Sequence, residues 1–244
     1  MAERRYEYAP AGTLPGLLQR GRGLGAMMAA EAPGAAAELV YGCIRREWRW
    51  DRQVDERVLY LARLVRDLEL PFGPVVEALE GEARGRADEV LELLARGYVR
   101  RNGHGDHARD EDSRAVPELL EELERCWVER TWCGPAALAR GLARFGPEAG
   151  GAASLLRRFW LWTPHSSERP AYLEALAAVA PAGLDEAYVE SLWDCESGAR
   201  LLGVRHAPER PEVADRLLRL RDDPLEEKAV RDAAAVRLGG GRAG

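Results

Sequence analysis

The chain of 244 residues contains a single lysine, Lys228, and arginine supplies its other positive charges. This bias, with the abundance of alanine, fits GC-rich bacterial coding and says little about function. Acidic residues outnumber basic ones, so the net charge is -6. Domains that bind nucleic acid are usually basic. The composition therefore disfavours nucleic acid as a partner.

Segments typical of membrane or secreted proteins are also missing from the sequence. No apolar run reaches the roughly 18 residues that a membrane-spanning helix needs. The charged N-terminus holds no apolar secretory segment. The four cysteines form no Cys-x-x-Cys pair. We therefore expect a cytoplasmic protein with reduced thiols and no contact with a membrane.

The alternating apolar and polar residues of a half-buried β-strand are absent as well. Apolar residues recur instead at helical spacing, as Val213, Leu217 and Leu220 do at i, i+4 and i+7. Prolines stand where helices could start or stop. The sequence predicts an all-α protein with about a dozen helices in helix–turn–helix order.

The expected organisation is a loose N-terminal arm at residues 1–13, followed by one helical unit over 14–240. The segment 101–114 is polar, contains glycine and has no apolar stripe. It is predicted to be an exposed loop that interrupts the unit. Asp223 and Pro224 are predicted to open the last helix, as its N-cap and its first residue.

Residues 14–31 are predicted to form one helical stretch that its glycines weaken. Within it, Gly21–Ala26 formally fits the dinucleotide-binding pattern Gly-x-Gly-x-x-Ala. A dinucleotide site needs that loop directly after a buried strand, and no strand precedes it. We interpret these glycines as small residues that let helices approach closely.

An internal repeat appears near the C-terminus. The stretches Ala199–Leu202 and Val230–Ala233 each place a small apolar residue and an arginine at the start of a helix, 31 residues apart. Self-similarity at a period of roughly 20–50 residues is typical of solenoids, in which each repeat packs on the next. The repeat predicts a stack of helical hairpins.

This pattern resembles HEAT or HEAT-like repeats, in which an aspartate at a turn often precedes an inner-helix arginine by six residues. Asp194 and Arg200 have this spacing, as do Asp51 and Arg57. The resemblance implies an α–α superhelix whose turn carboxylates pair with arginines of the adjacent repeat. Because HEAT units usually span ~40–47 residues, a shorter HEAT-like variant is the closer description.

The resemblance is good over residues 184–239, fair over 36–100 and poor over 101–180. The last copy departs from it, because Leu225 rather than an acidic residue lies six before Arg231.

One group of polar residues has the side chains of a metal site. His104 and His107, with Asp110 and Asp112 nearby, are possible metal ligands, yet real ligands are held by rigid elements. The sequence therefore predicts no metal site and no cofactor.

Three pairs of adjacent acids lie beside arginines: Glu121–Glu122, Asp222–Asp223 and Glu226–Glu227. We interpret these pairs as solvent-exposed charges on helix faces and ends. Ser166 and Ser167 follow His165, but no nucleophile-elbow pattern surrounds them. No catalytic residue is predicted.

The densest aromatic stretch is Phe159–His165. On a helix, Trp160 and Trp162 point about 200° apart, so both cannot fill the same interface. One of them could face a groove, where Trp127, Trp132 and Trp193 could join it. The alternative is that these tryptophans fill the space between stacked hairpins.

Some HEAT-like proteins are DNA glycosylases of alkylated bases, with aromatic side chains and an aspartate in a basic groove. By that resemblance Asp194 would be the carboxylate, and Trp160 or Trp162 the platform for the base. The negative net charge and the turn position of Asp194 argue against it. A hydrogen bond to Asp194 from a neighbouring arginine or a helix N-terminus would remove this alternative.

The favoured function is a non-enzymatic scaffold that binds another protein on its concave face. The predicted contact residues are Arg57, Trp160, Trp162, Trp193 and Arg200. Arg57 and Arg200 could belong instead to the ladder between repeats, which would make them structural. The alternatives left open, besides the glycosylase, are a lyase-like helper acting on a bound chromophore or cofactor and an inhibitor-like protein that shields an acid-averse partner.

Overall fold

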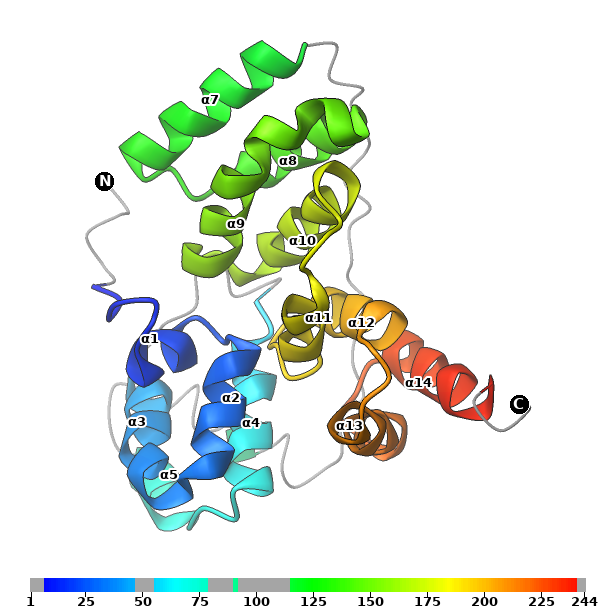
Figure 1. The fold of residues 1–244 in the computed structure, drawn as a ribbon. Helices are drawn as coiled ribbons and strands as arrows, with labels where there is room; N and C mark the ends of the chain where they lie inside the picture. The colour runs from blue at the N-terminus through cyan, green and yellow to red at the C-terminus, as the bar shows by residue number, and fades with distance from the viewer. Residues whose placement is uncertain (1–6, 47–54, 79–89, 92–114, 241–244) are drawn as a thin grey trace.

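The computed structural model describes residues 7–46, 55–78, 90–91 and 115–240. Over these residues it contains 13 α-helices and no strand, which confirms the predicted all-α class (Figure 1). None of the helices in this part of the chain has the length and apolar character needed to cross a membrane. The predicted loop 101–114, which includes His104 and His107, lies outside the described residues, and so does Asp51.

Five helices make up the N-terminal group (blue to cyan in Figure 1). They are α1 (Leu14–Gln19), α2 (Gly23–Glu31), α3 (Pro33–Arg45), α4 (Arg57–Asp67) and α5 (Gly73–Glu77). Their shared core consists of aliphatic side chains with Tyr41 and Tyr60 among them. Cys195, which lies far along the sequence, is buried in the same core.

The middle group (green to yellow-green in Figure 1) carries the aromatic stretch. Its elements are α7 (Val116–Glu129), α8 (Pro135–Ala143), the 3-10 helix η3 (Gly146–Ala152), α9 (Ala153–Trp162), the 3-10 helix η4 (Ser166–Glu168) and α10 (Arg169–Val179). Leu123, Leu142, Leu156, Phe159 and Tyr172 are fully buried at its centre. The core of this group is therefore aliphatic and aromatic.

The last group runs from yellow to red in Figure 1. It contains α11 (Asp185–Ser191), α12 (Ser197–His206), α13 (Pro211–Asp222) and α14 (Lys228–Gly240). The predicted stripe of Val213, Leu217 and Leu220 is buried in its core, as expected.

The predicted single helix over residues 14–31 is wrong, because the chain breaks at Gly21. Gly21 has a φ of 66°, a left-handed conformation that glycine adopts without steric cost. The interpretation of these glycines as close-packing residues is confirmed at Gly23. A Cβ there would lie 1.9 Å from the carbonyl oxygen of Glu190, so α2 meets α11 backbone to backbone.

The predicted start of the last helix at Pro224 is also wrong, because α14 begins at Lys228. Asp223 does not cap this helix. Its carboxylate receives hydrogen bonds from Arg63 (3.0 Å) and Arg66 (2.8 Å) of α4. The same carboxylate accepts the N–H of Leu225 at 2.9 Å, so the turn is held both locally and by α4.

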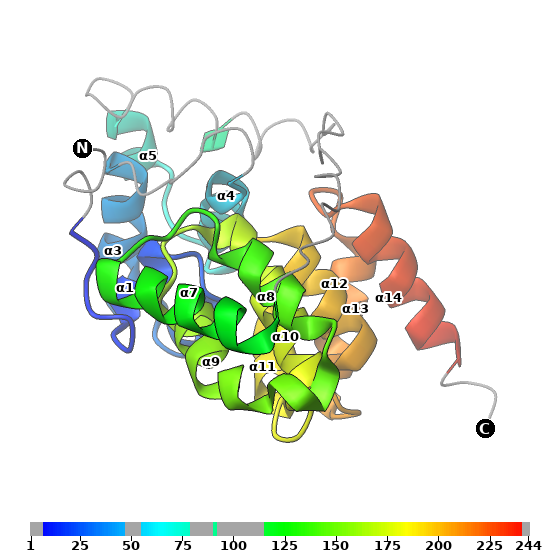
Figure 2. The ribbon, with the colours of Figure 1, turned by 90° about the horizontal axis from the view of Figure 1, so that it is seen from above.

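The three groups meet around the turn between α11 and α12. In both views α3 and α14 lie on opposite sides of the molecule, with α11 and α12 between them (Figures 1 and 2). The backbone N–H of Cys195 in this turn donates to the carbonyl of Gly21 at 2.9 Å. Repeats of a linear solenoid contact only their neighbours, whereas here the N-terminal helices pack against the C-terminal half of the chain.

Candidate binding surface

Arg57, a predicted contact residue, lies inside the protein with 3% of its surface exposed. Its guanidinium forms an ion pair with Asp55 and donates to the carbonyl oxygens of Gln19 (2.8 Å) and Pro164 (2.9 Å). It also donates to the hydroxyl of Tyr8 at 3.1 Å, which ties residues 7–13 of the predicted arm to the helices. Through these bonds the guanidinium of Arg57 joins the N-terminal group of helices to the middle group.

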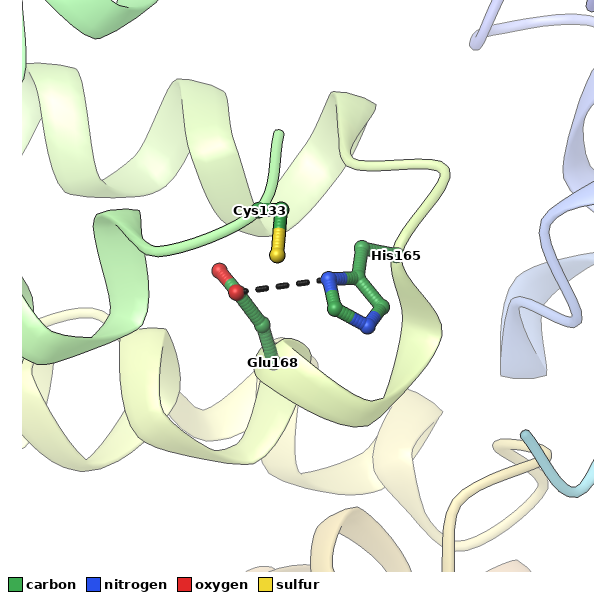
Figure 3. Close-up of side chains that lie close together, drawn as sticks. All are labelled: Cys133, His165 and Glu168. Atoms are coloured by element: carbon green, nitrogen blue, oxygen red, sulfur yellow. Dashed lines mark ion pairs between the residues drawn. The ribbon is translucent and has the colours of Figure 1, made fainter. Parts of the chain in front are cut away.

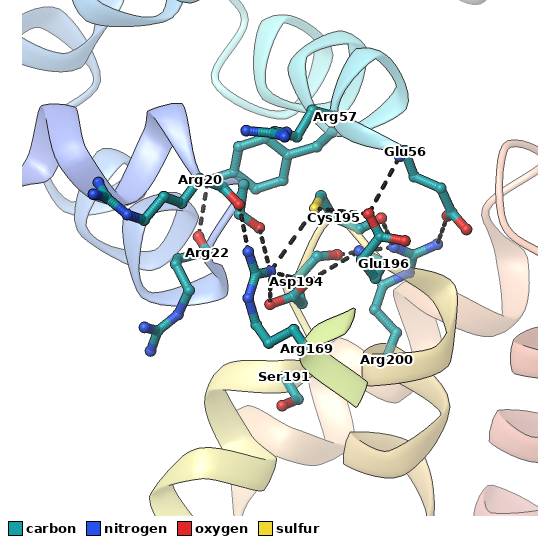
Figure 4. Close-up of polar contacts among 12 residues, drawn as sticks. Arg20, Arg22, Glu56, Arg57, Arg169, Ser191, Asp194, Cys195, Glu196 and Arg200 are labelled. Atoms are coloured by element: carbon teal, nitrogen blue, oxygen red, sulfur yellow. Dashed lines mark hydrogen bonds and ion pairs between the residues drawn. The ribbon is translucent and has the colours of Figure 1, made fainter. Parts of the chain in front are cut away.

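Arg200 is fully buried at the meeting point of the three groups (Figure 4). It donates twice to Glu226, each bond 2.8 Å long, and once to Glu56 at 3.3 Å. It also donates to the backbone carbonyls of Asp194 and Cys195. Arg57 and Arg200 are thus both held in internal ion pairs, although the acid that pairs with Arg57 is only two residues away and belongs to no adjacent repeat.

Asp194 is engaged in the same way. Both of its carboxylate oxygens lie 2.6 Å from Nη1 of the buried Arg169, and one accepts the N–H of Glu196 at 3.0 Å. A hydrogen bond to Asp194 from a neighbouring arginine is the feature expected to exclude a glycosylase, and Arg169 supplies it. The carboxylate is turned into the core, and the observation that favoured that enzyme is removed.

Two of the acids predicted to be solvent-exposed are buried, namely Asp223 and Glu226. Burial by itself raises the pKa of Asp223, but the hydrogen bond from Arg66 and the charge of Arg63 lower it to about 2. The sequence pattern misplaces both acids because their arginine partners lie on other helices.

Glu196 differs from the other acids of this cluster because its environment disfavours the charge. Burial, together with the neighbouring carboxylates of Glu56 and Asp55, raises the pKa of Glu196 to about 8. Burial also raises the pKa of the Cys195 thiol, so this cysteine stays protonated. Because the thiolate is the reactive form, Cys195 is not poised as a nucleophile.

The predicted divergence of Trp160 and Trp162 is observed. Trp160 is buried, with the guanidinium carbon of Arg22 at 4.2 Å from its ring centroid. Trp162 is 42% exposed. Trp193 is half-buried in a third place, between the N-terminal and C-terminal cores, with Arg216 above its ring.

Trp162 belongs to a cluster of aromatic rings on the middle group. The centroid of Trp127 lies 6.2 Å from that of Trp162 and 5.8 Å from that of Trp132, edge to face in both cases. Phe159, fully buried beneath them, lies 5.4 Å from Trp127. Edge-to-face packing at these distances is favourable, so the rings hold one another in place.

Two exposed arginines complete this surface. The guanidinium carbons of Arg130 and Arg158 lie 4.6 Å and 5.9 Å from the ring centroid of Trp127. We define the aromatic–arginine surface as the following set: Trp127, Arg130, Trp132, Arg158 and Trp162. It combines aromatic area with two cationic groups, the combination that recurs at protein-binding hot spots.

Arg130 is positioned by an unusual backbone conformation. It follows the last residue of α7 with a φ of 58°, and the next N–H, that of Thr131, donates to the carbonyl of Cys126 at 2.9 Å. Glycine usually occupies this position at a helix end. The left-handed conformation costs a residue with a side chain roughly 1–2 kcal/mol. Arg130 therefore adopts a backbone conformation that is unfavourable for arginine.

Sequence reasoning found Trp127, Trp132 and Trp162 but not their arginines. Arg158 could have been found, because it lies four residues before Trp162 and therefore on the same helix face. Arg130 could not, because its orientation depends on the left-handed turn. Sequence reasoning also missed a group of metal-ligand types at the edge of this surface, formed by Cys133, His165 and Glu168.

Comparison with known proteins gives no match: no family model fits the chain, and no curated protein or solved structure is significantly similar to it. The surface is therefore interpreted from its own geometry.

Proposed function

We propose that the protein is a non-enzymatic scaffold that binds another protein through the aromatic–arginine surface. The observation that carries this proposal is the exposed ring of Trp162, 42% accessible and held edge-on against Trp127. Large rigid aromatic side chains lose little conformational entropy on binding. Tryptophan and arginine are the residues most often found at the centres of binding energy.

The chemistry of the surface suggests the kind of segment that it binds. The exposed face of Trp162 suits an apolar or aromatic side chain of the partner. Arg130 and Arg158 suit a carboxylate nearby, because guanidinium–carboxylate hydrogen bonds are among the strongest in proteins. The proposed partner is therefore a protein segment with an apolar anchor next to an acidic residue.

A short HEAT-like stack is the framework that we propose for this surface. Arg169 and Arg200 stand 31 residues apart. Arg169 of α10 pairs with Asp194, in the turn after α11, and Arg200 of α12 pairs with Glu226, in the turn after α13. Arg231 follows after another 31 residues but is only half-buried. A repeated arginine with a repeated acidic partner is what a stack of related hairpins would require.

The proposal is tested by affinity capture from the native lysate, with crosslinking and mass spectrometry. Wild type is compared with Trp162→Ala and with a matched control, Phe72→Ala, which removes another exposed aromatic ring (52% accessible) on the N-terminal group. We expect one protein to be crosslinked to α7 or α9 in wild type and Phe72→Ala and to be lost in Trp162→Ala. Equal capture by all three would contradict the proposal.

A further inference from the structure

Three side chains with metal-binding atoms converge at the start of α10. Cys133 comes from the turn between α7 and α8, while His165 directly precedes the 3-10 helix η4 and Glu168 is its last residue (Figure 3). One atom from each, the thiol sulfur, an imidazole nitrogen and a carboxylate oxygen, lie within 4.8 Å of one another. Two separate turns thus bring three different ligand types to one point.

The spacing of the histidine and glutamate suits a shared ion. Nδ1 of His165 lies 3.3 Å from Oε1 of Glu168. Zinc bonds of ~2.0–2.2 Å at a tetrahedral angle place two such ligand atoms about 3.3–3.5 Å apart. The distance between these two atoms therefore matches that of two ligands on one zinc ion, and the sulfur of the exposed Cys133 lies within 4.8 Å of a ligand atom of both residues.

The carboxylate of Glu168 is held from outside the cluster. Oε1 accepts the N–H of Gly134 at 2.7 Å. Oε2 accepts the N–H of Ala136 at 3.1 Å and the hydroxyl of Tyr172 at 2.6 Å. Such supporting hydrogen bonds orient metal ligands in known sites. The bond to Gly134 also fixes the turn that carries Cys133 beside the glutamate.

His165 is likewise held by its backbone. Its N–H donates to the hydroxyl of Thr163 at 3.1 Å, and that hydroxyl donates to the carbonyl of His165 at 3.3 Å. Both residues are buried. The imidazole is therefore presented by a rigid turn, unlike the histidines of the segment 101–114, for which the sequence predicts an exposed loop.

We propose that Cys133, His165 and Glu168 bind one Zn²⁺ ion, with the fourth position open on the exposed side of Cys133. A thiolate with an imidazole suits zinc, whereas Mg²⁺ and Ca²⁺ prefer oxygen ligands alone. Three protein ligands leave one position for water or another donor. This inference is independent of the proposed function, because metal binding is measured without a partner.

The test is titration of the full-length chain, stripped with a chelator, with Zn²⁺ by calorimetry and with Co²⁺ by absorption. We expect one ion per chain, a thiolate-to-cobalt charge-transfer band, and no comparable binding of Mg²⁺. Cys133→Ser should abolish the band and weaken Zn²⁺ binding at least ~10-fold, the scale of losses at known sites. Because Cys133 is exposed, this variant should fold, which circular dichroism checks.

Two control variants make the test specific. Cys126→Ser removes the half-buried thiol of α7, and His104→Asn/His107→Asn removes the alternative histidines. Both should bind Zn²⁺ as wild type does. The proposal is overturned if folded wild type binds neither ion, if Cys133→Ser binds Zn²⁺ as tightly as wild type, or if either control variant loses binding.

Discussion

The guanidinium of Arg169 and the carboxylate of Asp194 form a buried ion pair in which both carboxylate oxygens lie 2.6 Å from one nitrogen. The side chains are 0% and 2% exposed. Arg169 also donates to the carbonyl of Arg20 at 2.5 Å. One arginine thus connects the start of α10, the turn before α12 and the end of α1, where the three helical groups meet (Figure 4).

This geometry predicts that Asp194→Asn is strongly destabilising. The substitution leaves the positive charge of Arg169 buried without a compensating negative charge, and breaking buried pairs in this way costs about 3–5 kcal/mol. Urea denaturation measures the loss. Lys228→Ala, which breaks the exposed pair with Asp232, is the control and should leave the midpoint unchanged. Equal small effects of the two substitutions would contradict the structural role given to Asp194.

Gly23→Ala should destabilise the protein because its new methyl group would overlap the carbonyl oxygen of Glu190, 1.9 Å away. The contact is with backbone, so α2 and α11 would have to separate. The matched control is Gly42→Ala in α3, where nothing lies within 4 Å of the added carbon. Alanine there should stabilise by about 0.5–1 kcal/mol through helix propensity.

Thermal unfolding of the two alanine variants should therefore shift the midpoint in opposite directions. A Gly23→Ala variant as stable as wild type would show that α2 and α11 are not in backbone contact.

The buried Glu196 predicts a pH dependence of stability. Its pKa in the folded protein is about 8, against 4.5 for the free side chain. Between these values the folded state keeps a proton that the unfolded chain has released, so stability falls as the pH rises through this range. Below it both states are protonated, and Glu196 has no effect.

Glutamine has the shape of the neutral acid but does not ionise. Glu196→Gln should therefore remove the loss of stability at higher pH. Relative to wild type, the variant should gain up to about 1.4 kcal/mol for each pH unit between about 5 and 8. Urea denaturation across this range measures the difference. Parallel pH profiles of variant and wild type would show that Glu196 is ionised in the folded protein.

Arg130→Gly should separate stability from binding. Glycine relieves the left-handed backbone at this position by roughly 1 kcal/mol, which offsets the loss of a cation–π contact of about 0.5–1 kcal/mol. The unfolding midpoint should therefore stay the same or rise slightly, while affinity for the partner falls about five-fold or more.

The control for the backbone effect is Arg219→Gly, at an exposed arginine inside α13. Here glycine should lower stability by about 1 kcal/mol through helix propensity and leave binding intact. If Arg130→Gly binds as wild type does, Arg130 is not part of the binding surface.

Patterns local to the sequence predicted the all-α class and the inward faces of the helices, because apolar spacing such as that of Val213, Leu217 and Leu220 is set within one helix. These patterns failed where side chains far apart in the sequence determine the local structure. The carboxylate of Asp223 is bound by Arg63 and Arg66 of α4 instead of capping α14. The break at Gly21 depends on a left-handed conformation that no neighbouring residue signals.

The same distinction holds for the candidate sites. The divergence of Trp160 and Trp162 follows from helix geometry and was predictable. The burial of Arg57 and Arg200 was only one of two alternatives, because their partners include Pro164 and Glu226, which lie far from them in the sequence. Cys133 and the pair of His165 and Glu168 come from two segments about 30 residues apart in the sequence. Their proximity in the fold could therefore not be seen in the sequence.

Binding through the aromatic–arginine surface is tested most directly by the dissociation constant of the captured partner, measured by calorimetry for wild type, Trp162→Ala and Phe72→Ala. Loss of a hot-spot tryptophan costs about 2 kcal/mol or more, a weakening of about 30-fold. We expect this loss for Trp162→Ala and an unchanged dissociation constant for Phe72→Ala, with circular dichroism showing that both variants are folded. A constant unchanged in Trp162→Ala would contradict the claim that the aromatic–arginine surface binds the partner.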